Sequence, residues 1–286
     1  MTTKRILSRD EQFRLRNVLQ AAALAALMDS RRWEPGDLAF QGGTCLHLAH
    51  GSARFSEDLD FMVRGGLSLG GLAKEVQRRL RLPTDIPTGL SVSVTPSRSD
   101  RNPHAFMVTL SGADVIGSAK VKIELWQTEA QVLKSVQVVV STIASPSGVQ
   151  AFVPTATLDE ILADKIYALG ARERLKPRDV FDLWWLFNRP AAPPTLRPNS
   201  LLTRLAIYPR GSLDATATQW LAGAHKQLTE LQRPATAALV EADLKRWLPG
   251  YWPLSESQTR AMITSATEQL QVGLRIMQGY VQDPQP

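Results

Sequence analysis

The chain has 286 residues, 44% hydrophobic and 21% charged, which is ordinary for a globular protein and enough to bury one large domain or two lobes. Its single cysteine excludes a disulfide framework and a cysteine-rich zinc site, and favours a reducing cytoplasm. The sequence has no secretory signal pattern and no apolar run long enough to span a membrane, so we expect a cytoplasmic protein without a membrane partner. A formal net charge of +6 is compatible with a nucleic-acid partner.

The N-terminal part predicts a helix, a strand and a glycine turn. A Ser-x-x-Glu capping box opens the helix at residues 8–30, and the strand follows at 38–40. Gly42 and Gly43 predict a turn before a short helix at Thr44–Ala49. Such a turn would let backbone N–H groups approach a triphosphate closely, although a Gly-Gly pair by itself is usually only a turn.

Two aspartates, Asp58 and Asp60, open a second strand. Side chains two residues apart leave the same face of a strand, so the carboxylates would lie side by side while Leu59 and Phe61 point into a core. The carboxylates repel each other, and an Mg²⁺ ion that also binds substrate phosphates would remove the conflict. The alternative is a solvated pair at a strand edge.

Further alternating segments predict strands at 90–95, 104–110, 120–125 and 136–140, with a loop at 141–148 ending the β-rich part. In the third of these, Val121 and Ile123 face one side while Lys122 and Glu124 face the other. The alternative is that this segment is an edge strand, on which charged side chains prevent aggregation with other sheets.

The second half predicts helices. A second capping box at Thr157–Glu160 opens a helix that carries Lys165. Four basic residues between 172 and 178 precede another helix, on which Asp179 and Asp182 share a face. Ordinary surface pairing, such as Arg178 with Asp182, would explain these charges. Later helices are predicted at about 212–232, 235–248 and 255–280.

Two stretches carry a family resemblance. Gly-Gly-Thr-Cys-Leu-His-Leu-Ala-His-Gly (42–51), followed by Arg-Phe-Ser-Glu-Asp-Leu-Asp-Phe (54–61), closely resembles the AbiEii/AbiGii family, nucleotidyltransferase-like toxins of bacterial type IV toxin–antitoxin systems within the polymerase-beta-like superfamily. Residues 157–187 resemble the second conserved block of these toxins. The resemblance implies an α+β fold, with a nucleotidyltransferase-type mixed β-sheet lobe and flanking helices over 1–150, and a mainly α-helical lobe over 151–286 that completes the active-site cleft.

The resemblance also implies roles for particular residues. Asp58 and Asp60 would hold Mg²⁺, and Glu124 would be a third carboxylate that completes metal binding or activates the attacking hydroxyl. Lys165 would hold the nucleotide phosphates, and Asp182 would orient it or serve the chemistry. The remaining nucleotide-binding residues would be Gly42, Gly43, Thr44, Ser56, Arg178 and Asp179, and the sequence does not separate Asp179 from Asp182.

Ser56 also suggests a regulatory hypothesis, because it stands two residues before Asp58. A phosphate on its hydroxyl would add about two negative charges beside the acids and compete with the triphosphate for Mg²⁺ and Lys165. The alternative is a loop serine that bonds to its own backbone.

The implied activity is transfer of a nucleoside monophosphate from a nucleoside triphosphate to an acceptor, with release of pyrophosphate. The tRNA 3′ end is the expected acceptor, and a cognate antitoxin is the expected protein partner. Three alternatives remain open: transfer to a protein or small molecule, growth inhibition by nucleotide binding without turnover, and metal-dependent phosphohydrolysis.

Overall fold

The computed structural model describes residues 4–82, 86, 89–97, 102–144, 148, 150–209 and 211–283. The chain forms two compact units. Unit 1 comprises Met1–Gly51, Ser56–Lys134 and Val138–Thr155, and unit 2 comprises Ser52–Phe55, Ser135–Gln137 and Ala156–Pro286. Two short segments from the N-terminal half of the sequence therefore belong to the C-terminal unit.

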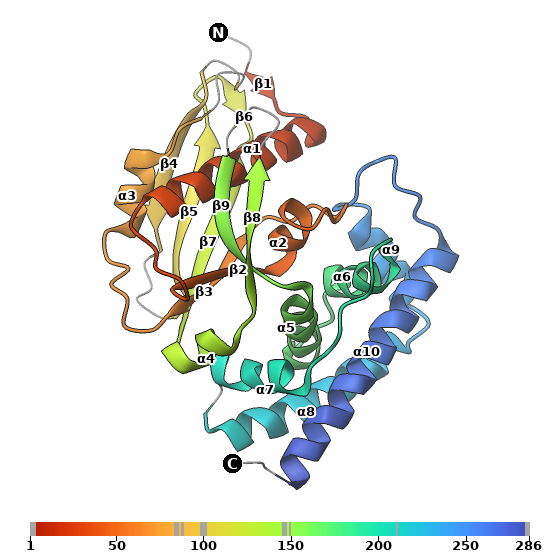
Figure 1. Cartoon of the computed structure of the whole chain (residues 1–286). Helices are drawn as coiled ribbons and strands as arrows, with labels where there is room; N and C mark the ends of the chain where they lie inside the picture. Colours follow the sequence, from red (N-terminus) through yellow and green to blue (C-terminus); the bar gives the residue numbers. More distant parts are fainter. Residues whose placement is uncertain are drawn as a thin grey trace. The chain divides into compact units, whose positions relative to one another are not determined.

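Unit 1 contains a mixed seven-stranded sheet in the order β4-β5-β7-β3-β2-β9-β8 (Figure 1). Within it, β7 pairs in parallel with β3 and antiparallel with β5. The segment that carries Lys122 and Glu124 is therefore an interior strand, and the edge-strand alternative for its charges is wrong. The strands are β2 (Leu38–Gln41), β3 (Leu59–Arg64), β4 (Ser91–Pro96), β5 (His104–Ser111), β7 (Ala119–Thr128), β8 (Val138–Ala144) and β9 (Gln150–Ala156).

Helix α1 (Arg9–Asp29) covers part of this sheet, where it packs against β5 and β7 (Figure 1). It begins with the predicted capping box, in which the Ser8 and Glu11 side chains each accept a hydrogen bond from the other's backbone N–H. Its alanine-rich second half is almost completely buried. Helix α3 (Leu72–Arg79) packs beside it. Strands β1 (Arg5–Ile6) and β6 (Val115–Ile116) pair in parallel and form a separate two-stranded sheet.

The end of the β-rich part differs from the prediction. Residues 141–144, expected in a loop, continue β8, and β9 adds a strand that pairs in parallel with β2 through Phe40 and Thr155. Pro154 lies inside β9 and argues against a strand when the sequence is considered alone. Residues 145–147 and 149 of the predicted loop lie outside the described residues. Helix α4 (Ala130–Ser135) was also not predicted.

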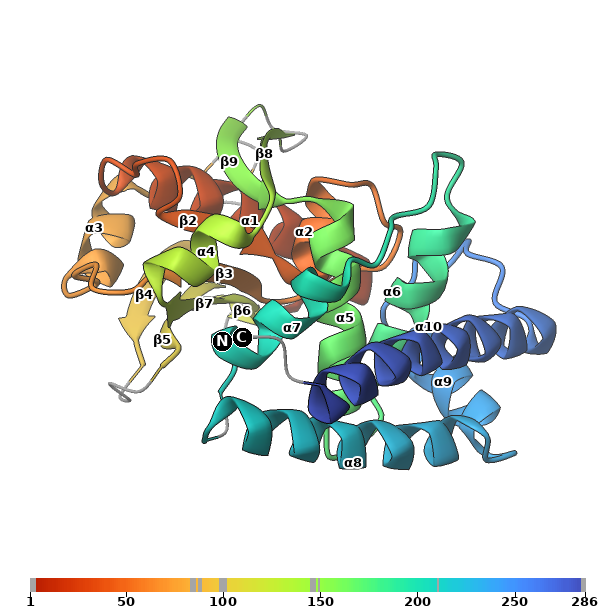
Figure 2. The same ribbon diagram turned by 60° about the horizontal axis from the view of Figure 1, so that its bottom comes forward.

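Unit 2 is helical. Its helices are α5 (Leu158–Ala171), α6 (Pro177–Asn188), α7 (Pro198–Ile207), α8 (Leu213–Leu231), α9 (Thr236–Leu244) and α10 (Glu256–Gln282). Figure 2 shows α10 alongside α8, and the two helices are in contact. Helix α8 also packs closely against α5. Gly170 on α5 makes this possible, since a Cβ at this position would lie 2.5 Å from the buried Trp220 ring on α8. The predictions located α8 and α10 closely, extended α9 too far and missed α7.

The predicted capping box at Thr157 does not form. Thr157 precedes α5, but within the described chain its side chain makes no capping hydrogen bond. The Glu160 carboxylate instead accepts hydrogen bonds from Arg204, at 2.9 Å, and from the Ser200 hydroxyl, at 2.8 Å. Glu160 on α5 and Arg204 on α7 are both buried. The Glu160 carboxylate, which the local sequence pattern assigns to a helix cap, therefore forms an ion pair between two packed helices.

Candidate functional site

The site residues predicted from the sequence are divided between the two units. In unit 1, α2 (Gly42–Leu48) starts directly after β2, so the predicted turn at Gly42 and Gly43 is the first turn of the helix. Gly42 has φ +80°, and a Cβ on it would lie 2.5 Å from Asp60 Oδ2. The absence of a side chain therefore allows the Asp60 carboxylate to lie against the start of the helix.

The two aspartates occupy the start of β3. Asp58 is the residue before the strand, Asp60 is its second residue, and both are half-buried. The buried Thr44 hydroxyl donates a hydrogen bond to the Asp58 backbone carbonyl. Leu59 and Phe61 are fully buried, which confirms the predicted direction of the strand's apolar face.

Glu124 lies directly opposite Asp60 in the parallel register of β3 and β7. The Lys122 ammonium donates a hydrogen bond to the Glu124 carboxylate. This bond raises the pKa of Lys122; burial opposes the rise, and the charges of Glu124, Asp58 and Asp60 add to it. The ammonium therefore lies in the field of three carboxylates. The alternating charges of β7 place Lys122 on this face, but the sequence alone assigns it no role.

The loop that precedes Asp58 is attached to α1. Gln20 is fully buried, and its Nε2 donates to the carbonyl oxygens of Ser56, at 2.9 Å, and Glu57, at 3.2 Å. Arg16 forms an ion pair with Glu57 at 3.2 Å. Ser56 is half-buried in this loop. The amide of Gln20 within a buried alanine-rich stretch is a sequence feature that could have revealed this anchor.

In unit 2, Lys165 on α5 contacts both acids of α6. Its Nζ lies 3.2 Å from Asp179 Oδ1 and 2.7 Å from Asp182 Oδ2. Both carboxylates therefore orient the lysine. The sequence alone did not distinguish the role of Asp179 from that of Asp182. The alternative interpretation, a surface ion pair between Arg178 and Asp182, is wrong. Asp182 is fully buried, and the Arg178 guanidinium lies over the Trp247 ring, 4.6 Å from its centroid.

Two arginines outside the predicted site residues extend this group. The Arg54 Nε and Nη2 atoms donate to the two Asp182 oxygens at 2.7 and 2.8 Å, in the bidentate geometry that suits a guanidinium and a carboxylate. Arg172 donates from Nε to Asp179 Oδ2 at 2.6 Å. We call Arg54, Asp182, Lys165, Asp179 and Arg172 the charge cluster. Its three cations and two carboxylates leave a net charge of +1.

The charges of the cluster hold one another in the ionised state. Burial alone would lower the pKa of Lys165, but the nearby Asp182 and Asp179 raise it. Burial would likewise raise the pKa of both carboxyls. Lys165 and Arg172 instead lower the pKa of Asp179, and Arg54 and Lys165 lower that of Asp182. A lysine and two acids are therefore kept charged in a buried position.

Across the described residues, no cluster of three or more His, Cys, Asp and Glu side chains is arranged to hold a metal ion. Asp58 and Asp60 offer two carboxylates, so a metal there would take its other ligands from water or substrate. No helix in the described ranges is long and apolar enough to cross a membrane.

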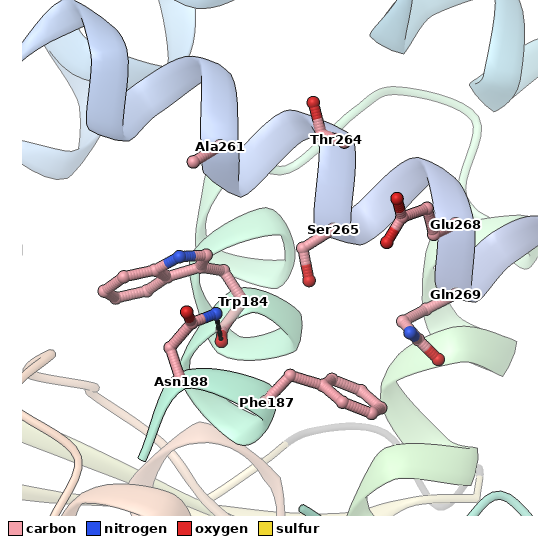
Figure 3. A pocket seen from close by; sticks show the side chains of 8 residues that line it. All are labelled: Trp184, Phe187, Asn188, Ala261, Thr264, Ser265, Glu268 and Gln269. Atoms are coloured by element: carbon pink, nitrogen blue, oxygen red, sulfur yellow. Dashed lines mark hydrogen bonds between the residues drawn. The ribbon is translucent and has the colours of Figure 1, made fainter. Parts of the chain in front are cut away.

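A separate open groove of about 340 Å³ lies in unit 2 between α6 and α10 (Figure 3). The Trp184 and Phe187 rings form its α6 side, and Ser265, Glu268 and Gln269 belong to its α10 side. Among the described residues, those that line the groove include none of the predicted site residues.

Comparison with solved structures identifies the fold. The chain is similar to MenT4, the nucleotidyltransferase toxin Rv2826c from Mycobacterium tuberculosis H37Rv, with a TM-score of 0.56 and 15% identity over 95% of this chain and 89% of MenT4. It is also similar to JHP933 from Helicobacter pylori, with a TM-score of 0.51 and 19% identity over 95% of this chain and 96% of JHP933. The chain therefore shares the fold of MenT4 and JHP933, and the predicted α+β class is confirmed.

The sequence identifies the family. A family model described as "Nucleotidyl transferase AbiEii toxin, Type IV TA system" matches residues 25–256. The chain therefore belongs to the AbiEii family of nucleotidyl transferase toxins, as its two motif blocks predicted. No match was found among curated proteins.

Proposed function

We propose that this toxin transfers a nucleoside monophosphate from a nucleoside triphosphate to a hydroxyl at the 3′ end of tRNA, with Mg²⁺ as cofactor. Membership of the AbiEii family supports a nucleotidyltransferase and implies a nucleoside triphosphate substrate and an antitoxin partner. The observation that carries the proposal is the position of Asp60, which lies against Gly42 on one side and opposite Glu124 on the other.

The residues at the start of β3 fit a magnesium ion. Two carboxylates supply the hard oxygen donors that Mg²⁺ prefers, and a site with so few protein ligands suits a metal that also binds substrate phosphates. Asp58 and Asp60 would hold the ion. When bound, it would neutralise phosphate oxygens around the reacting phosphorus.

The proposed reaction is an in-line substitution at the α-phosphorus. The acceptor oxygen forms a bond to this phosphorus, the bond to the oxygen that bridges the α- and β-phosphates breaks, and pyrophosphate leaves. We assign the acceptor's proton to the Glu124 carboxylate. Gly42, Gly43 and Thr44 are proposed to contact the phosphates, with Ser56 as a further nucleotide-binding residue. Most of the rate enhancement would come from positioning and charge neutralisation.

The charge cluster of unit 2 is proposed to bind phosphate oxygens of a nucleotide. Lys165 is buried and held by two carboxylates, so its ammonium is preorganised. The cluster's net charge of +1 favours an anionic ligand. Arg178 and Asp179 remain proposed nucleotide-binding residues. The role of Asp179 and Asp182 would be to hold Lys165 in place.

The acceptor is proposed on general grounds. The chain has a net charge of +6, and Arg174 is exposed between α5 and α6. Both features suit a polyanion such as RNA. The labelling experiment therefore adds total tRNA and also monitors the protein itself as an acceptor.

The test incubates the purified protein with Mg²⁺, total tRNA and each α-³²P-labelled nucleoside triphosphate in turn. We expect label on tRNA with wild type and none with Asp60→Asn, which removes one metal ligand and preserves the side-chain shape. Label on the protein itself would replace tRNA by a protein acceptor. Release of free phosphate without labelling would favour phosphohydrolysis, and no turnover of any triphosphate would contradict the proposed reaction.

A further inference from the structure

Lys122 is a cation beside the Asp58, Asp60 and Glu124 carboxylates of unit 1, and the proposed reaction assigns it no role. It lies on β7, inside the sheet, two residues before Glu124 on the same face. Its ammonium bonds to Glu124, and Asp58 and Asp60 also act on it. A lysine on an interior strand does not protect a sheet edge, so another physical reason must account for it.

The charges supply that reason. Without Lys122, the mutual repulsion of the three carboxylates at this end of β3 and β7 would be larger. A divalent cation bound by Asp58 and Asp60 would take over this neutralisation and would repel the ammonium. The Lys122 side chain is 41% exposed, so its long stem leaves the ammonium free to turn toward solvent or toward a ligand. A nucleoside triphosphate brings several negative charges to the same place.

We propose that Lys122 is a triphosphate-binding residue that serves as counter-ion to the three carboxylates until a metal–nucleotide complex binds. The inference rests on the proposed function, because it requires a triphosphate at Asp58 and Asp60. The ammonium pairs with Glu124 when no triphosphate is bound. In the loaded site it contacts phosphate oxygens, which leaves the Glu124 carboxylate available to the acceptor hydroxyl.

This double role predicts two opposite effects of Lys122→Met. Removing the competing cation should tighten the binding of a divalent metal ion alone by about tenfold. Removing the phosphate contact should weaken the binding of a nucleoside triphosphate by about tenfold. A purely structural role would move both affinities in the same direction or leave both unchanged. Lys122→Arg keeps the charge and should stay within about threefold of wild type in both measurements.

The metal measurement is an electron paramagnetic resonance titration of the full chain with Mn²⁺ in the absence of nucleotide. The nucleotide measurement is calorimetric titration with an α,β-methylene triphosphate in saturating Mg²⁺. The matched control is Lys120→Met, since Lys120 lies two residues earlier on the same face and is exposed, opposite Thr109. Circular dichroism checks the fold of each variant, and Lys122→Gln replaces Lys122→Met if the latter does not fold.

The outcomes separate this inference from the proposed function. Wild type that binds neither Mn²⁺ nor the analogue contradicts both. Wild type that binds both and labels an acceptor, with Lys122→Met equal to Lys120→Met, overturns the role of Lys122 alone. Parallel loss of both affinities in Lys122→Met also overturns it. Tighter Mn²⁺ binding with weaker nucleotide binding supports it.

Discussion

Removal of the Asp182 carboxylate should destabilise unit 2 strongly. Asp182 is fully buried and accepts three hydrogen bonds, two from Arg54 and one from Lys165. Asp182→Ala would leave the Arg54 guanidinium, which is also buried, without its bidentate partner, and Lys165 with Asp179 alone. The remaining cations would then be desolvated without compensation.

The expected loss is about 3–5 kcal/mol in the free energy of unfolding, the range found when one partner of a buried ion pair is removed. This is a large part of the roughly 5–15 kcal/mol that stabilises a typical domain. An exposed ion pair sets the scale for comparison. Arg260 and Glu256 are 70% and 69% exposed, and Arg260→Ala should cost no more than about 0.5 kcal/mol.

The assay is urea unfolding of wild type, Asp182→Ala and Arg260→Ala, followed by far-ultraviolet circular dichroism. We expect a much lower urea midpoint for Asp182→Ala only, with an unchanged slope. If Asp182→Ala unfolds within 0.5 kcal/mol of Arg260→Ala, the cluster contributes no net stability and the reasoning fails. If it behaves as expected, loss of toxicity in this variant would be no evidence for a catalytic role of Asp182.

Further predictions concern the acids, the loop and pH. Gly42→Ala should lower activity and stability more than Gly36→Ala. Both glycines have positive φ, but an added Cβ at Gly42 lies 2.5 Å from Asp60 Oδ2, whereas one at Gly36 meets no described atom within 4 Å. Melting curves and labelling assays of the two variants check this. Asp60→Asn should reduce nucleotidyl transfer at least about 100-fold while the melting temperature stays within about 2 °C, and a larger fall in melting temperature would contradict a purely chemical role. Gln20→Leu should cost about 1–3 kcal/mol in urea unfolding and lower turnover by loosening the loop before the acids, whereas normal stability would contradict the anchor. The pKa of each carboxyl bound to Lys165 is lowered, so its stabilisation is present above the ordinary value of 3.8 and is lost as pH falls below it. The raised pKa of Lys165 gives stabilisation that is present below its ordinary value of 10.5 and is lost above it, so unfolding curves should show a plateau between about pH 5 and 10 in the contribution of the cluster.

Much of the fold and part of the site could be predicted from the sequence because their determinants are local. Alternation along β7 located its buried and polar faces, and the capping box at Ser8 located the start of α1. The spacing of Asp58 and Asp60 after Gly42 indicated the superfamily, and the residues at 42–51 and 54–61 indicated the family. In each case neighbouring residues suffice, since strand and helix periods determine which side chains share a face.

The tertiary structure alone decided the partners of the charges. Arg54 and Asp182 are 128 positions apart in sequence, and Gln20 holds carbonyl groups 36 and 37 positions away. Glu160 has the sequence context of a helix cap and is instead buried against Arg204. A buried charge pairs with whichever partner the packing of helices and strands brings within hydrogen-bond distance. The free energy lost by leaving it unpaired exceeds the free energy gained from a local contact such as a helix cap.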